Sequence, residues 1–326
     1  MLDVDTNSCE VMLMPNTVFS RLTRQWIISG KYIRRLNIPI AHALDLDVKR
    51  NFTNKVKQME DNIVHKVLVA FDFDHTVIES NSDLWINRLA PGHKIPDELK
   101  SLYKKDGWTE YMQEVFKYLH REGCTRSAYE KCLDEIYLAD GMRELITGIP
   151  LESSELIIIS DSNSFFIDHI LKKLGIRELF SAIFTNPASF DNKGLLNIEM
   201  YHEQDWCGLS TKNLCKGYIL NEYVKSRAQK NVVFPHIAYV GDGTNDFCPS
   251  MRLRECDSTY PRCGFSLLNH IPKMETEKGL RIEAEVCPWD SGVEILELVL
   301  KYYKDLNTKE IPRERLRDPV KRKSDS

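Results

Sequence analysis

The stretch Val67–Thr76, VLVAFDFDHT, runs five apolar residues into a pair of aspartates, Asp72 and Asp74. The apolar part has no polar face, which is expected for a strand buried on both sides in a parallel sheet. Two carboxylates this close raise each other's pKa and repel, so a purely structural role would be costly. Such a pair is typical of a site where a cation lies between the carboxylates, or where one of them does chemistry.

The composition of the 326-residue chain is that of a globular protein, with 42% hydrophobic and 28% charged residues. A formal net charge of -4 and the lack of interleaved basic and aromatic residues argue against nucleic acid as a partner. The apolar runs are too short for a transmembrane segment, and the acidic first residues suit neither a secretory signal nor a transit peptide. The nine scattered cysteines favour reduced thiols, so we expect a cytoplasmic protein.

Segments with strand and helix patterns alternate through most of the chain. This alternation predicts an α/β fold with a doubly wound parallel sheet. Strands are expected at 66–71, 155–163, 179–186 and 235–241, and helices at 164–176, 212–230 and 293–306.

The long helical stretch between the first two strands exceeds a simple crossover, and we interpret residues 84–150 as a small helical cap inserted after the first strand. The catalytic core is then expected to comprise residues 63–83 and 151–305. Residues 1–62 are predicted to form an N-terminal extension, and its basic amphipathic segment favours a surface extension over a membrane-surface helix. Residues 306–326 are expected to be a disordered basic tail.

Three predicted strands end in polar and acidic residues, in the segments AFDFDHT, IISDSN and YVGDGTND. In an open α/β sheet, ligands bind outside the carboxyl ends of the strands. We therefore expect one site to contain Asp72, Asp74, Ser160, Asp161, Asp242 and Asp246, with Thr76 nearby. Oxygen ligands suit Mg²⁺ better than zinc, and a hard cation at a sheet edge commonly serves phosphoryl chemistry. Asp72 can then be both a metal ligand and a nucleophile, while Asp74 can protonate a leaving group and activate water.

The motifs of this chain resemble those of the haloacid-dehalogenase-superfamily phosphatases. DFDHT fits their D-x-D-x-T signature, and IISDSN, Lys216 in NLCK and GDGTND match the other three motifs in order and spacing. NSDLW, GWTEYM, FTNPASF and GDGTNDFCP are similar to the subgroup of phosphoethanolamine/phosphocholine and pyridoxal phosphate phosphatases. The similarity covers about residues 66 to 303. His75, where such proteins often have Glu or Asn, follows the general acid directly and is expected to tune it.

The resemblance implies a Mg²⁺-dependent reaction through an aspartyl-phosphate on Asp72, with Asp74 as proton donor and later base. It also implies Mg²⁺ ligands from the Asp72 carboxylate, the Asp74 backbone carbonyl and the Asp242 carboxylate, with Asp246 supporting the water shell of the metal. Ser160 would donate to a phosphate oxygen and Lys216 would neutralise charge. The alternatives are a helix-capping serine and an ordinary solvated lysine.

Asp83 and Asp161 correspond to substrate-binding positions in the subgroup, where carboxylates suit an amine or quaternary ammonium. Each could instead cap a helix. The aromatic residues Trp85, Trp108 and Tyr111 are candidates for lining the cap, although aromatic residues at helical spacing are more often core.

The resulting hypothesis is a phosphomonoester hydrolase for a small phosphometabolite, either phosphoethanolamine/phosphocholine or pyridoxal 5'-phosphate. The alternatives are a pyrophosphate or thiamine-phosphate-type phosphatase, and a catalytically silent metabolite-binding relative. An intact Asp72, Asp74, Lys216 and Asp242 argue against the silent relative. His202, Cys207 and Cys215 have a loose zinc-like spacing, and from the sequence we favour packed thiols over a structural metal there.

Overall fold

The structure, a computed structural model, describes residues 63–307 apart from residue 105. The predicted N-terminal extension lies outside the described residues, as does the predicted tail from residue 308 onward. Strands comprise β1 Val64–Phe71, β2 Ser154–Asn163, β3 Ala182–Asn186, β4 Ala188–Phe190, β5 Leu196–Ile198, β6 Val232–Gly241, β7 Ser258–Pro261 and β8 Glu285–Val286. Helices comprise α3 Ser82–Trp85, α4 Asp97–Lys100, α5 Trp108–Arg121, α6 Arg126–Leu133, α7 Met142–Gly148, α8 Ser164–Lys173, α9 Lys216–Ala228, α10 Phe247–Ser250, α11 Ser266–Lys278 and α12 Gly292–Asn307. Over this part of the chain, no helix combines the length and apolar character needed to cross a membrane.

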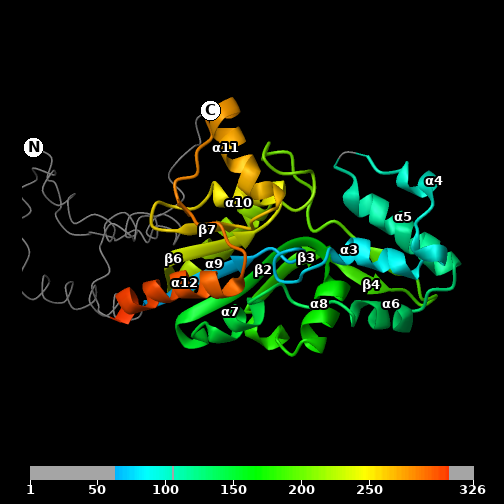
Figure 1. The fold of residues 1–326 in the computed structure, drawn as a ribbon, viewed down its shortest axis with the longest axis horizontal. Coiled ribbons are helices and arrows are strands. Elements are labelled where there is room, and N and C mark those ends of the chain that lie inside the picture. Colours follow the sequence, from blue (N-terminus) through cyan, green and yellow to red (C-terminus); the bar gives the residue numbers. More distant parts are fainter. Residues whose placement is uncertain (1–62, 105, 308–326) are drawn as a thin grey trace, which may run out of the picture. The chain divides into compact units, whose positions relative to one another are not determined.

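The main sheet confirms the predicted α/β class. Among the described residues it has six strands in the order β3-β2-β1-β6-β7-β8, and every neighbouring pair is parallel (Figure 1). β1 lies between β2 and β6, so the three strands with polar ends are adjacent. This order brings their carboxyl ends to one edge of the sheet.

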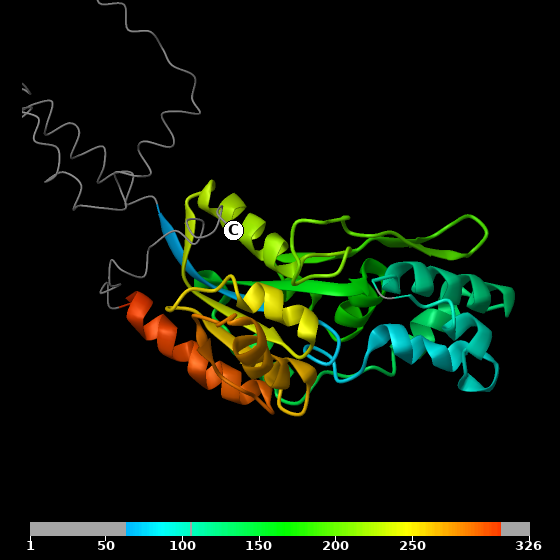
Figure 2. The ribbon, with the colours of Figure 1, turned by 90° about the horizontal axis from the view of Figure 1, so that it is seen from above.

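Alternate side chains of β1 enter two different cores. Val67, Val69 and Phe71 pack with α7, α8 and α12, whereas Leu68 and Ala70 pack with α9, α10 and α11. α9 and α12 accordingly lie on opposite sides of the strands (Figure 2). Burial on both faces explains why residues 67–71 of β1 form a continuous apolar run instead of an alternating pattern.

The segment between β1 and β2 is helical, as predicted, and α3 to α6 gather beyond the carboxyl end of β1 (Figure 1). α7 instead lies against α12 of the core. At this contact Gly141 has a φ of 66°, and a Cβ there would lie 2.8 Å from the backbone nitrogen of Gly292. Glycine is required at this position both for its left-handed backbone and for the close approach.

A small hairpin, β4–β5, adds a second layer against the helical insert. It is antiparallel and separate from the main sheet. The side chain of Gln113 in α5 makes two hydrogen bonds to the backbone of β5. It accepts from the Ile198 N–H at 2.9 Å and donates to the Leu196 carbonyl at 3.3 Å. The hairpin therefore supports α5 from a point more than 70 residues away in sequence.

Candidate active site

The turn after β1 carries the two aspartates of the opening motif. Asp72 continues the ladder by donating its N–H to Val240 of β6 at 2.9 Å. The chain then reverses through His75, whose φ of 55° is unusual for a residue other than glycine. Arg262 fixes the reversal, because its guanidinium donates to the His75 carbonyl at 2.6 Å and pairs with Glu79 at 2.6 Å.

A cluster of buried charges lies at this edge of the sheet. Carboxylate oxygens of Asp72, Asp242 and Asp246 lie within 4.8 Å of one another. Lys216, the first residue of α9, places its Nζ 2.8 Å from Asp72 Oδ2 and 2.8 Å from Asp246 Oδ1. Only 1% of Lys216 is exposed, so the alternative of an ordinary solvated lysine is wrong.

Asp246 is held entirely by donors of the protein. Its Oδ1 accepts from Lys216 and from the Tyr239 hydroxyl at 2.7 Å, and its Oδ2 accepts from the N–H groups of Asp242 and Gly243 at 3.0 and 2.9 Å. With both oxygens used twice, Asp246 orients Lys216 and the loop that carries Asp242. The acceptor positions of its carboxylate are thus taken by protein donors, and the predicted support of a metal's water shell stays a prediction.

Burial raises the pKa of Asp72 well above its ordinary value, and the charge of Lys216 opposes that rise. Burial, reinforced by Asp246, likewise raises the pKa of Asp242 to about 7. For Lys216, burial lowers the pKa, but Asp246 and Asp72 outweigh it and leave the pKa above its ordinary value. The carboxyl groups of Asp72, Asp242 and Asp246 thus lie near a single ammonium group, that of Lys216. When ionised, they carry an excess of negative charge, and their oxygen atoms fit a hard divalent cation.

Asp74, two residues after Asp72, contacts the start of α3. The Ser82 N–H donates to its Oδ1 at 3.0 Å, and the carboxyl is largely buried. Burial raises the pKa of Asp74 well above its ordinary value, and the nearby Asp83 adds to the rise while Ser82 opposes it. A raised pKa favours the protonated form of the carboxyl group, which is the direction that a general acid requires.

The end of β2 contributes Ser160 and Asp161. Ser160 is fully buried, and its Oγ accepts from the Ser162 N–H at 3.2 Å. Asp161 is exposed and accepts from the Asn245 side chain at 3.2 Å. The alternative that Asp161 caps α8 is wrong, because Asn163 is the N-cap and accepts from the Phe166 N–H.

Asp83 follows the same pattern at the start of the helical insert. Asn81, not Asp83, is the N-cap of α3. Asp83 is 2% exposed and accepts from the Trp108 indole N–H at 2.7 Å and from Asn163 at 3.4 Å. Burial raises its pKa to about 7, although the bond from Trp108 opposes the rise.

Aromatic rings extend this site into the insert. The Trp108 ring lies 5.7 Å from that of Tyr103 and 5.5 Å from that of Tyr111, centroid to centroid. Trp85, the other predicted lining tryptophan, donates its indole N–H to the Cys132 carbonyl at 3.0 Å and stacks under Arg88. Its indole is thus held within the insert.

Other residues near the site have roles that the sequence left open. His75 Nδ1 lies 2.8 Å from the Glu79 carbonyl, so its ring binds the turn itself. The hydroxyl of Thr76, in the D-x-D-x-T signature, donates to Asp242 Oδ1 at 3.4 Å. Sequence reasoning missed Tyr239 and Arg262, and only the position of Tyr239 three residues before Asp242 offered a signal.

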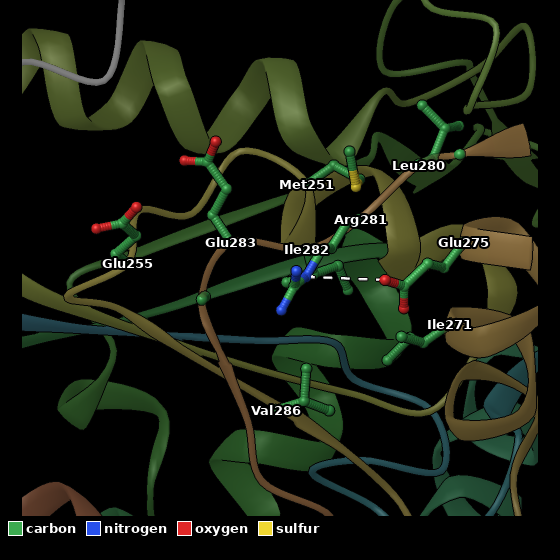
Figure 3. A pocket seen from close by; sticks show the side chains of 11 residues that line it. Met251, Glu255, Ile271, Glu275, Leu280, Arg281, Ile282, Glu283 and Val286 are labelled. Carbon is green, nitrogen blue, oxygen red and sulfur yellow. Dashed lines mark ion pairs between the residues drawn. The ribbon is translucent and has the colours of Figure 1, made fainter.

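A separate surface pocket lies near α11 and β8 (Figure 3). The predicted site residues are absent from its lining, which includes the ion pair of Arg281 with Glu275. The lining consists of Met251, Glu255, Ile271, Glu275, Gly279, Leu280, Arg281, Ile282, Glu283, Ala284 and Val286. The carboxylate cluster at the end of β1 and β6 therefore remains the candidate active site.

The chain is similar to known proteins over most of its described residues. It is 42% identical over 233 residues to the pyridoxal phosphate phosphatase of Mus musculus, and the alignment covers 71% of this chain and 96% of that protein. It is 35% identical over 241 residues to the phosphoethanolamine/phosphocholine phosphatase of Homo sapiens, covering 72% and 90%. A solved phosphoserine phosphatase with bound substrate aligns at 21% identity with a TM-score of 0.49, over 72% of this chain and 98% of that one.

The family described as Putative Phosphatase matches residues 67–303, which agrees with the predicted range of similarity, about residues 66 to 303. The predicted subgroup and the predicted enzyme class, a phosphatase, are confirmed. The chain belongs to the Putative Phosphatase family.

Proposed function

We propose that the protein is a Mg²⁺-dependent phosphomonoester hydrolase that acts through an aspartyl-phosphate on Asp72. The observation that carries the proposal is the pairing of Asp72 with the buried Lys216 at 2.8 Å, two residues before Asp74, whose pKa is raised by burial. A nucleophile, a charge-neutralising cation and a general acid thus lie at one strand end. A protein that only binds a metabolite would not need the second aspartate.

The carboxylates of Asp72 and Asp242 and the backbone carbonyl of Asp74 would hold Mg²⁺, while Asp246 holds Lys216 and the loop of Asp242 in position. The bound ion would neutralise carboxylate and phosphoryl charge. Lys216 contributes a second positive charge at the nucleophile, and Ser160 can donate its hydroxyl to a phosphoryl oxygen.

In the first step, an Asp72 oxygen attacks phosphorus as the P–O ester bond breaks, and Asp74 gives its proton to the leaving oxygen. In the second step, the Asp74 carboxylate takes a proton from water while the water oxygen attacks phosphorus. The bond between phosphorus and Asp72 then breaks and inorganic phosphate leaves. Asp74 is protonated again, so both aspartates return to their initial state.

The substrate we propose is a small phosphate ester with a positive charge or an aromatic ring, namely phosphoethanolamine/phosphocholine or pyridoxal 5'-phosphate. Neither Asp83 nor Asp161 caps a helix, and Asp161 raises the pKa of both Asp74 and Asp83 by repulsion. An ammonium group would relieve this repulsion. The rings of Trp108, Tyr103 and Tyr111 could contact a quaternary ammonium or a pyridoxal ring.

Phosphate release from an aryl phosphate tests the reaction class. We expect activity to disappear when Mg²⁺ is removed, to return when Mg²⁺ is added back, and to be inhibited by Ca²⁺, whose larger coordination shell misplaces the phosphate. Asp72→Asn should be inactive under every condition and serves as the control for contaminating phosphatases. Full activity of the Mg²⁺-free protein would contradict the proposal. A screen of the two amine esters and pyridoxal 5'-phosphate then ranks the substrates.

A further inference from the structure

Three cysteines that are dispersed in sequence converge beside the active-site lysine. Cys207 lies in the loop after β5, Cys215 is the residue before α9, and Cys248 lies in α10. All three are buried and free of disulfide bonds. The sequence interpretation included Cys207 and Cys215 but missed Cys248, whose signal was its place two residues after Asp246.

The sulfur atoms are spaced as a metal would require. Sγ of Cys248 lies 3.5 Å from that of Cys207 and 3.8 Å from that of Cys215, and all three lie within 4.8 Å of one another. Zinc bound to thiolates at about 2.3 Å in tetrahedral geometry holds its sulfur atoms about 3.8 Å apart. A disulfide would need about 2.05 Å between two of them and would leave the third unused.

Polar side chains contact the sulfur atoms and the loop that carries Cys207. Ser210 places its hydroxyl 3.3 Å from Cys215 Sγ, and Arg252 donates toward Cys207 Sγ at 3.9 Å. Gln204 fixes the loop by accepting from the Cys207 N–H at 2.8 Å and donating to the Thr211 carbonyl at 2.6 Å. Purely packed thiols do not require a facing hydroxyl and a guanidinium, whereas thiolate ligands are stabilised by such donors.

In the sequence, His202 was a candidate ligand together with Cys207 and Cys215, although packed thiols were favoured there. Its Nε2 instead accepts the backbone N–H of Cys215 at 3.0 Å. Among the described residues, His202 belongs to neither of the two metal-compatible groups, the three cysteines and the carboxylate cluster. His202 therefore orients the backbone that carries Cys215.

We propose that Cys207, Cys215 and Cys248 bind one structural Zn²⁺, with the Ser210 hydroxyl oxygen or a water molecule as the fourth ligand. The three thiols lose their protons to solvent when the ion binds, and no redox step is involved. This site is distinct from the carboxylate cluster, which offers oxygen ligands for a harder ion.

The position of the proposed zinc site would let the ion support the Lys216–Asp246 pair of the active site. Cys215 directly precedes Lys216, and Cys248 follows Asp246 by two residues, while Lys216 and Asp246 form the 2.8 Å ion pair. Zinc would thus join the start of α9 to α10 immediately behind that pair. The close fit is also visible at Gly217, where a Cβ would lie 2.7 Å from Cys248 Sγ. This role rests on the proposed function, whereas metal binding itself does not.

The test is metal analysis and cobalt substitution of the full chain. Elemental analysis should find about one zinc per chain, and Co²⁺ substitution should give the thiolate-to-cobalt charge-transfer band of a thiolate-rich site. Cys248→Ser should lose both the zinc and the band. Cys124→Ser, at a partly buried cysteine of the insert, is the matched control and should keep both.

Two further measurements keep the result decisive. In Asp72→Asn the cobalt band should persist, which separates the thiolate site from the carboxylate site and from any failure of the proposed phosphatase reaction. If Cys248→Ser does not fold, a thiol-blocking mercurial added to the unmodified chain should release zinc to a chromogenic chelator. Unmodified protein that binds no zinc and shows no cobalt band, or a Cys248→Ser variant that retains both, would overturn the proposal.

Discussion

Trp108 of α5 donates its indole N–H to Asp83, with 2.7 Å between Nε1 and Oδ2. The bond joins the helical insert to the residue that follows Ser82, whose own N–H binds Asp74. The insert and the proposed general acid are therefore linked through two consecutive residues. We therefore expect a ligand that contacts Asp83 to change the pKa of Asp74, which Asp83 helps to raise.

Substrate charge should reveal the roles of Asp83 and Asp161. Asp83→Asn and Asp161→Asn remove negative charge without altering the nucleophile. A charge-assisted contact of about 1–3 kcal/mol corresponds to about a 5- to 150-fold loss in kcat/KM. We expect this loss with phosphoethanolamine or phosphocholine, a smaller one with pyridoxal 5'-phosphate and little change with a neutral aryl phosphate.

Asp97→Asn is the matched control for these variants, because Asp97 is an exposed aspartate of the insert paired with Lys100. It should leave all substrates unchanged. Equal losses on every substrate in the Asp83 and Asp161 variants would instead assign those carboxylates a structural role.

The leaving group should reveal the role of Asp74. Asp74→Asn removes the proton donor, and general acid–base groups contribute about 10²–10⁴-fold. The deficit in phospho-enzyme formation should be larger for an alkyl ester, whose leaving oxygen needs the proton, than for an aryl ester. Rapid-quench kinetics on the two esters measures this difference. An equal deficit for both esters in that step would argue against proton donation by Asp74.

Stability in Mg²⁺-free buffer should fall as the pH rises. The pKa values of Asp83 and Asp242 rise from 3.8 to about 7 in the folded protein, so the native state binds protons more tightly than the unfolded chain. Their contribution to stability is therefore present below pH 3.8 and is lost as the pH rises through about 7. Because the proposed Mg²⁺ would bind the ionised carboxylates, it should raise Tm more at pH 8 than at pH 5.5. Asp242→Asn should remove most of the pH 8 effect, and an equal Mg²⁺ effect at both pH values would count against this site.

Loss of Lys216 should destabilise the protein as well as inactivate it. Lys216→Met leaves Asp72 and Asp246 buried without their shared ammonium, and breaking a buried pair costs about 3–5 kcal/mol. Urea unfolding in Mg²⁺-free buffer measures this loss. Lys225→Met is the matched control, because Lys225 lies on the same helix and forms an exposed pair with Glu222. A Lys216→Met variant as stable as the control would contradict the buried pairing.

The features that the sequence predicted have short-range signatures. β1 and β2 each contain a continuous apolar run that is buried on both faces, and polar residues of the site follow each run. Roles for Asp72, Asp74 and Asp242 were expected because their motifs follow buried strands, and roles for Ser160 and Lys216 because of the family resemblance; these roles stay predictions. The structure places these side chains around one sheet edge.

The features that the sequence did not predict depend on distant partners. β4 and β5 have three residues each, and β8 has two, so their patterns are too short to identify. α11 contains Pro272, which obscures its helical pattern. Cys248 and Arg262 acquire their roles only when α10 and the end of β7 meet the turn and loop of other strands.

The central claim is that Asp72 becomes phosphorylated, and trapping that intermediate tests it most directly. Asp74→Asn should accumulate the phospho-enzyme from an aryl phosphate, because its leaving group needs no acid while hydrolysis lacks the base. Acid quenching and peptide mass spectrometry should then find one phosphoryl group on Asp72, removable by hydroxylamine as an acyl phosphate. Asp72→Asn should show none. Phosphorylation at another residue, or turnover by Asp74→Asn with no phosphorylated peptide at any time point, would contradict the account.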